Sequence, residues 1–142
     1  MRSYAWVGVI LLMAGACGGA PTEDDTELPA ATVEAREGQT FRLSPGGMAR
    51  VGRDGLLISF RSVTADSRCA VDVVCVWEGD ATARVDVTVG RMAWTPFDLH
   101  TSLEPRAVQF RERTVTLVAV EPSPRSDERI DPAHYIITLR VD

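Results

Sequence analysis

The chain has 142 residues, of which 20 are acidic and 15 basic, so its net charge at neutral pH is −5. All the basic residues are arginine, and none of them form a cluster that stands out from its surroundings. Because binding to a phosphate backbone needs a basic surface, this balance excludes nucleic acid as a partner. The part of the chain beyond the N-terminal segment, roughly 100 residues, suits one compact domain and is too short for two.

The N-terminus has the pattern of an export signal. A single positive charge, Arg2, precedes an apolar run from Tyr4 to Met13, and the small residues Ala14-Gly15-Ala16 follow it. The uncharged stretch of 13 residues is shorter than the roughly 20 that cross a hydrocarbon core. We therefore predict a cleaved signal peptide over residues 1–16 rather than a membrane-spanning anchor.

The residues Ala14-Gly15-Ala16-Cys17 also resemble the lipobox of bacterial lipoproteins, with alanine at position 14 where leucine is most usual. The resemblance implies a diacylglyceryl thioether on Cys17 and a third acyl chain, such as palmitate, on the new amino group. Several acyl chains hold a protein on a bilayer where a single chain binds only marginally. Gly18 is not the aspartate that retains such proteins at the inner membrane, so the resemblance implies an outer-membrane anchor facing the periplasm.

Small and acidic residues follow Cys17, and too few of them are apolar to bury a core. We predict a flexible tether over residues 17–35 and one folded domain over residues 36–142. Cleavage removes Arg2 alone among the charged residues, so the mature chain has 14 arginines and 20 acidic residues, a net charge of −6.

Strand patterns dominate the predicted domain. The clearest is Ala81–Val89, where alanine and valine alternate with threonine, arginine and aspartate, as in a strand with one buried face. Apolar runs are rich in β-branched residues, and no window carries a helical stripe. The other predicted strands are Thr40–Leu43, Leu56–Thr64, Met92–His100, Ala107–Phe110, Arg113–Val120 and His134–Val141.

Seven or eight short strands in about 100 residues predict an all-β fold. We expect an antiparallel, two-layer, Ig-like β-sandwich, with a small β-barrel as the alternative. The expected core residues are Ile58, Phe60, Val85, Val87, Val115, Leu117, Tyr135, Ile137 and Leu139.

Cys69 and Cys75 have five residues between them, and three kinds of site could use such a pair. Redox catalysis of the thioredoxin kind needs C-x-x-C at a helix N-terminus, and no helix is predicted here. A zinc or copper site would need further ligands. The candidates are His100, His134, Asp98, Met48 and Met92, which include no close histidine pair.

The third kind of site is a structural disulfide. After export the domain lies in an oxidising compartment, where cysteines tend to pair. Lipidation of Cys17 would leave Cys69 and Cys75 for one another. We predict a disulfide between them, a strand from Cys75 to Trp77, and an indole of Trp77 that packs over the crossing.

The run Asp66-Ser67-Arg68-Cys69, then Cys75-Val76-Trp77, Gly79 and Ala81, resembles a motif of the type SRCPxxVxCVWxGxA. This motif is associated with small uncharacterised bacterial lipoproteins and secreted proteins. The later LVAVEPSP and YIITLRV segments are similar to that group as well. The chain differs at Ala70, where proline is common, and at Glu78, which is often alanine. The resemblance implies an exported all-β domain with a cysteine staple, in which Arg68, Trp77 and Gly79 are structural, and it implies no activity.

The sequence contains no G-x-S-x-G and no H-E-x-x-H motif, and acid pairs such as Glu78 and Asp80 are common on exposed turns. We expect no catalytic residue, no cofactor and no bound metal. The segment Glu121–Pro132 is predicted to be a solvated loop, with a recognition loop as the alternative. The functional hypothesis is a non-catalytic, membrane-anchored envelope module that binds another envelope protein or polymer; the alternative is a small inhibitor or a periplasmic ligand-binding domain.

Overall fold

The computed structural model describes residues 32–142. The predicted signal peptide, Cys17 and most of the predicted tether lie outside the described residues. No helix within residues 32–142 is long and apolar enough to span a bilayer. The elements of this part of the chain are β1 (Thr32–Ala35), β2 (Thr40–Leu43), β3 (Met48–Val51), β4 (Leu56–Asp66), β5 (Ala81–Val89), β6 (Thr95–His100), β7 (Ala107–Phe110), β8 (Arg113–Glu121), the 3-10 turn η1 (Pro132–His134) and β9 (Ile136–Val141).

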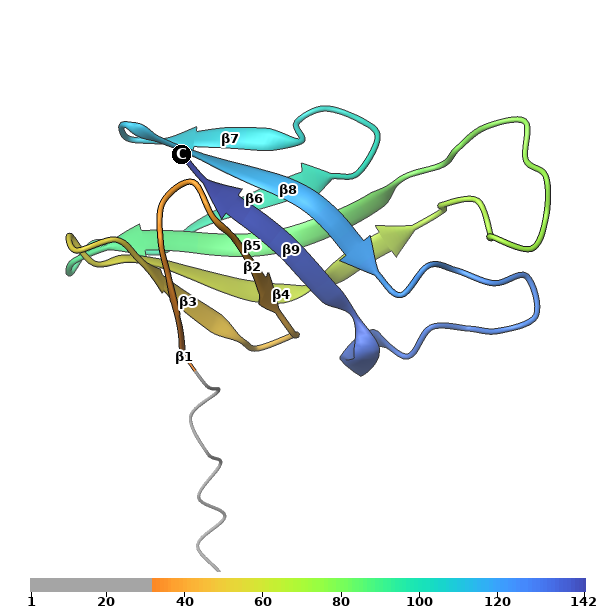
Figure 1. Cartoon of the computed structure of the whole chain (residues 1–142), viewed down its shortest axis with the longest axis horizontal. Helices are drawn as coiled ribbons and strands as arrows, with labels where there is room; N and C mark the ends of the chain where they lie inside the picture. Colours follow the sequence, from red (N-terminus) through yellow and green to blue (C-terminus); the bar gives the residue numbers. More distant parts are fainter. Residues whose placement is uncertain (1–31) are drawn as a thin grey trace, which may run out of the picture.

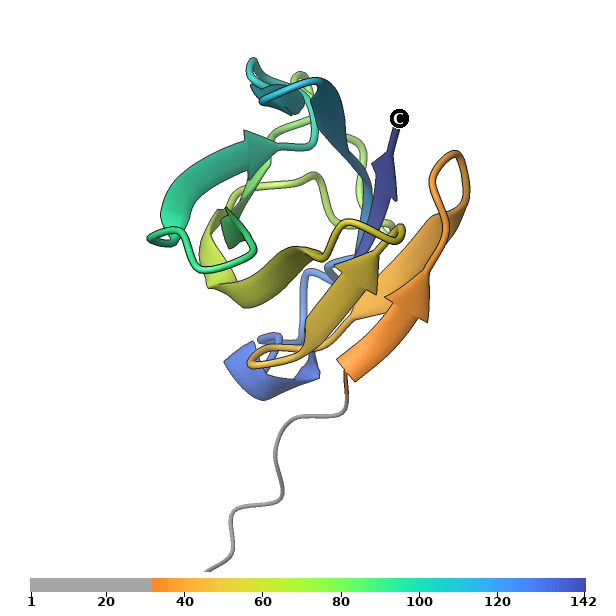
Figure 2. The same ribbon diagram turned by 90° about the vertical axis from the view of Figure 1, so that its left-hand side faces the viewer.

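The strands form two sheets that enclose a common core (Figures 1 and 2). One sheet has five strands in the order β1-β3-β4-β5-β6, and the other has four in the order β2-β9-β8-β7. Neighbouring strands are antiparallel except for β1 and β3, which run parallel. Neither sheet closes into a barrel. The prediction of an all-β sandwich is confirmed.

Strand β5 shows how the sequence pattern produces the sheet. Ala81, Ala83, Val85 and Val87 are fully buried, whereas Arg84 between them is exposed. This is the alternation expected of a strand with one face on the core. Thr88 departs from the pattern, because it is buried although it lies on the predicted polar face. Its hydroxyl donates a hydrogen bond of 2.8 Å to the carbonyl oxygen of Met92, which satisfies the buried polar group.

The structure changes several of the predicted strand boundaries. β1 and β3 were not predicted, and β1 lies in residues assigned to the tether. β6 begins at Thr95 because the preceding residues form the turn from β5. β9 begins only at Ile136, since η1 precedes it and the side chain of Asp131 accepts a hydrogen bond from the Ala133 amide at its start.

All nine predicted core residues are buried, and none is more than 7% exposed. Leu43, Leu56, Leu99 and further apolar side chains complete the cluster between the sheets. Within residues 32–142, no buried side-chain nitrogen or oxygen lacks a hydrogen-bond partner. The core is therefore apolar, and its few polar groups are satisfied.

A pair of valines tests the location of this core. Val85 is fully buried on β5, whereas Val118 on β8 is 46% exposed. We expect Val85→Ala to lower the free energy of unfolding by about 2 kcal/mol, because it removes two buried carbons and leaves a cavity. Val118→Ala should change it by less than about 0.5 kcal/mol. Urea unfolding measures both, and equal losses from the two variants would contradict the assignment of the core.

Candidate functional site

Two long loops lie side by side at one end of the sandwich, and both project away from the sheets (Figure 1, the green loop and the blue loop at the right). The cysteine loop, residues 67–80, connects β4 to β5, and the proline loop, residues 122–131, connects β8 to η1. The amide of Val71 donates to the carbonyl oxygen of Pro124 at 3.0 Å. The amide and hydroxyl of Ser126 donate to the carboxylate of Asp72 at 2.9 and 2.5 Å. We call the two segments the paired loops.

A disulfide closes the cysteine loop. Cys69 and Cys75 are joined with an S–S distance of 2.07 Å, as predicted. Below this bond the two legs of the loop are held together by backbone hydrogen bonds from Cys69 to Glu78, at 2.8 Å, and from Ser67 to Asp80, at 2.7 Å. The loop is thus a narrow, stapled projection from the sheet.

Gly79 allows these two legs to approach each other. Its φ is +71°, a conformation that residues with a side chain rarely adopt. A Cβ atom at this position would lie 1.9 Å from the carbonyl oxygen of Ser67. Any side chain at position 79 would force the legs apart, which explains why the narrow loop requires glycine here.

Arg68 ties the cysteine loop to the proline loop. Its guanidinium donates to both carboxylate oxygens of Asp66, at 2.9 and 2.6 Å, and to the carbonyl oxygens of Val120 and Pro122. The side chains of Arg68 and Asp66 are only 13% and 11% exposed. The hydroxyl of Tyr135 donates to the same carboxylate at 3.0 Å. One partly buried ion pair therefore links the end of β4, the end of β8 and the residue before β9.

The pKa values of this cluster reflect burial and pairing. Burial alone would raise the pKa of Asp66, but the hydrogen bonds from Arg68 and Tyr135 outweigh it, so the pKa lies below its usual value. Burial, followed by the hydrogen bond to Asp66, raises the pKa of Tyr135. Asp66 is therefore ionised and Tyr135 neutral at neutral pH, which are the states that the hydrogen bonds require.

Asp80 anchors the other leg of the cysteine loop. One of its carboxylate oxygens contacts Nδ1 of His100 at 2.7 Å. The other accepts hydrogen bonds from the Thr101 hydroxyl and from the amides of Ser102 and Leu103, at 3.2, 2.9 and 3.3 Å. Burial would raise its pKa, but these donors outweigh it and lower the pKa to about 2. A carboxyl group with this pKa is not a general acid near neutral pH, so Asp80 serves to hold the connection after β6.

The tip of the cysteine loop carries large apolar side chains that nothing covers. Val74 is fully exposed, Val76 is 91% exposed and Trp77 is 82% exposed. Val71 and Val73 are exposed as well. The prediction that Trp77 packs over the disulfide is therefore wrong, and so is the predicted strand over Cys75 to Trp77. The physical reason is that the staple forms a projection beyond the sheets, where no facing layer exists to bury these residues.

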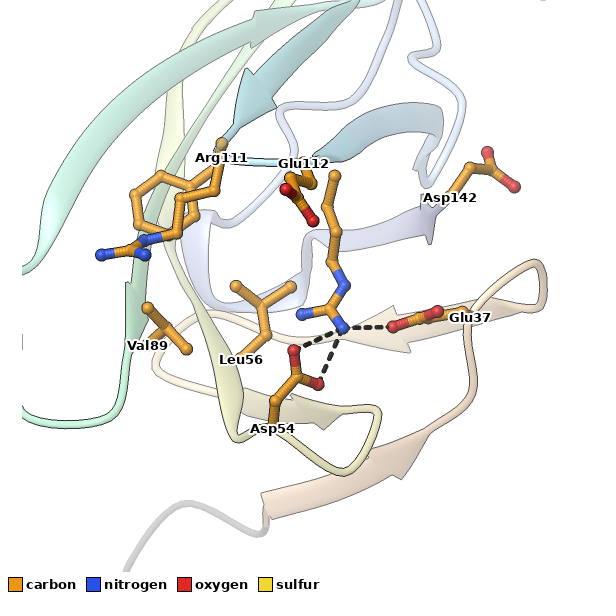
Figure 3. Close-up of a pocket in the computed structure, with 9 residues that line it drawn as sticks. Glu37, Asp54, Leu56, Val89, Arg111, Glu112 and Asp142 are labelled. Carbon is orange, nitrogen blue, oxygen red and sulfur yellow. Dashed lines mark hydrogen bonds and ion pairs between the residues drawn. The ribbon is translucent and has the colours of Figure 1, made fainter.

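The opposite end of the sandwich holds an open hollow of about 700 Å³ (Figure 3). Leu56, Val89 and Phe110 form its apolar part. Arg113 reaches into it and pairs with the carboxylates of Glu37 and Asp54, at 2.5 and 2.7 Å. Because this cation already has two acidic partners, it offers little positive potential to an anionic ligand.

The predicted metal candidates are dispersed over the fold. His100 pairs with Asp80, His134 ends η1, and Asp98 forms an ion pair of 2.6 Å with Arg84. Met48 begins β3, and Met92 lies in the turn after β5. Within residues 32–142, no three His, Cys, Asp or Glu side chains are grouped in a way that could hold a metal ion. Glu78 lies exposed in the cysteine loop.

Cys69, Cys75, Arg68 and Gly79, which the sequence indicates as structural, lie together at the cysteine loop. The exposed apolar tip, the Asp72 to Ser126 contact and the Asp80 anchor have no signal in the sequence, because they depend on where the two loops lie in the fold. Comparison of the chain with protein-family models, curated proteins and solved structures found no match.

The Asp80 anchor makes stability depend on pH. An aspartate in an unfolded chain titrates near pH 4, whereas the folded pKa of Asp80 is about 2. Its contribution, roughly 2 kcal/mol, is fully present above the unfolded pKa and is lost as pH falls through the folded pKa. We expect Asp80→Asn to lose less stability than the wild type between about pH 5 and about pH 2. The control is Asp127→Asn, at an exposed position of the proline loop, which should lose as much stability over this pH range as the wild type. Urea unfolding at each pH measures both variants, and equal losses of stability in the two would contradict the assignment.

The staple should also contribute to stability. For a closed loop of this length the chain-entropy model gives about 2 kcal/mol. The double variant Cys69→Ser, Cys75→Ser should therefore unfold at a lower urea concentration than the wild type, and addition of reductant should shift the wild type to the same midpoint. A transition that neither change affects would show that the bond does not constrain the fold.

Proposed function

We propose that this chain is a lipid-anchored protein of the bacterial envelope that acts as a non-catalytic binding module and presents its paired loops to another envelope protein. The lipid bilayer is its first partner, through acylated Cys17, in the outer membrane facing the periplasm. The binding surface is the apolar tip of the cysteine loop. Within residues 32–142 this proposal assigns no catalytic, cofactor or metal role to any side chain.

The single observation that carries the binding proposal is the exposure of Val74, Val76 and Trp77 on a stapled loop. Large apolar side chains grouped on an otherwise polar surface are typical of interaction sites. Binding loops are commonly held by a rigid scaffold, and here the scaffold is the sandwich together with the Arg68 cluster.

The titratable groups near the loops support a non-catalytic role. Asp66 and Asp80 accept several hydrogen bonds each, and both pKa values are lowered. Within residues 32–142, the hydrogen bonds of the His100 ring involve Nδ1 only. No hydroxyl or thiol therefore forms a hydrogen bond with Nε2, as a nucleophile activated by this nitrogen would. These contacts favour a structural function for both acids.

The length of the predicted tether is compatible with an anchored domain. Fourteen residues separate Cys17 from the first residue of β1. A fully extended chain of this length spans at most about 50 Å. A domain on such a tether stays close to the membrane and to proteins embedded in it, which raises their effective concentration for one another.

Acylation and partner binding can be tested in one strain. The full chain, expressed with its own signal in a Gram-negative host, should fractionate with the outer membrane and show acyl chains on Cys17 by intact mass. The Cys17→Ser variant should lose both properties, whereas the double variant Cys69→Ser, Cys75→Ser should keep them.

Photoreactive residues at several exposed positions of the domain should yield a discrete adduct with another protein. Recovery of an unmodified Cys17 from the soluble fraction would refute the anchor, and substrate turnover by the purified protein would refute the non-catalytic assignment.

A further inference from the structure

We infer that the tip of the cysteine loop inserts into an apolar cleft with a basic rim on its protein partner, with Trp77 as the central side chain. The inference rests on the proposed binding function and adds the chemistry of the partner's site. Three properties of the paired loops carry it, namely their fixed shape, the residues at the tip and their charge.

The tip is held in one shape before any partner binds. The disulfide closes it, the Gly79 leg lies against Ser67, and Asp72 is bound to Ser126 of the neighbouring loop. Arg68 fixes the base through contacts with Val120 and Pro122. A loop that is already ordered loses little conformational entropy when it binds, which favours association. A narrow, rigid projection fits a concave surface better than a flat one.

The side chains of the tip are those that dominate protein interfaces. Tryptophan is among the residues most enriched at the energetic centre of an interface, where it fills a pocket from which water is excluded. Val74, Val76 and Trp77 lie within four consecutive residues of the cysteine loop, and all three are more than 80% exposed. A cleft that receives them must therefore have an apolar floor.

The charges around the tip determine which surfaces it can approach. The paired loops contain three arginines and six acidic residues, a net charge of −3. This charge repels the anionic lipids of a bacterial bilayer, and it would repel the same end of a second copy of this chain. It attracts a basic surface, so the rim of the partner's cleft is expected to carry arginine or lysine. A protein cleft is thus favoured over both the bilayer and self-association.

A photoreactive residue at position 74 of the full chain, in intact cells, tests the partner class. We expect an adduct with one protein from this position and none from position 118, which lies exposed on β8. An adduct with lipid, an adduct with a second copy, or equal yields from the two positions would overturn the inference. Adducts that form only from other loops or strand edges would overturn it as well, while leaving the proposed binding function intact. If no position gave a protein adduct, both would fail.

The adduct partner, purified, then tests the chemistry of the contact with the detergent-solubilised full chain. Trp77→Ser should weaken the affinity by roughly 30-fold. The matched control is Trp94→Ser, at the turn before β6 on the opposite end of the sandwich, which should leave the affinity unchanged (Figure 1). Because the rim contact is electrostatic, added salt should also weaken binding and slow association. Equal effects of the two tryptophan variants, or binding that salt does not change, would overturn the inference.

Discussion

The partly buried ion pair of Arg68 and Asp66 is the contact on which the loop end of this protein depends. The guanidinium binds a carboxylate at the end of β4 and two carbonyl oxygens at the end of β8, so one side chain joins the two sheets where both loops begin. Removing one member of such a pair leaves the other charge partly buried and unmatched, which costs more than the loss of an exposed ion pair. The disulfide acts only on the cysteine loop, whereas Arg68 sets the position of that loop relative to its neighbour.

This division explains how an apolar tip can be tolerated on a small domain. Exposed valines and a tryptophan would ordinarily collapse onto the nearest apolar surface. Here Gly79 and the staple keep the loop narrow, and Asp80 and Arg68 fix its two legs to opposite sides of the sandwich end. The core is complete without the tip, because no residue of the cysteine loop belongs to the buried cluster between the sheets. The tip is therefore free to serve recognition without weakening the fold.

The sequence predicted the sheets well because their signal is local. The alternation in β5 and the runs in β2 and β7 carry their own period, and these three strands have the predicted bounds. β1 was missed because three of its four residues are exposed and no buried face shows in its sequence, and β3 was missed because it lies between two glycine-containing turns. Trp77 was predicted to pack over the disulfide, where its indole would bury a large apolar area. Its exposure depends on the absence of a facing layer, and the contacts of Arg68 join residues 52 and 54 positions apart; neither property is visible in a local pattern.

The proposed binding surface requires that Trp77 stand exposed on the tip of the cysteine loop in the unbound protein. In the mature chain with Trp94→Phe, Trp77 is the only tryptophan, so its fluorescence can be measured alone. We predict that acrylamide quenches this emission almost as strongly as it quenches free tryptophan. Because acrylamide is uncharged, added salt should leave the quenching unchanged. Emission that is shielded from the quencher would show that the indole is buried, and the tip could then not be the proposed binding surface.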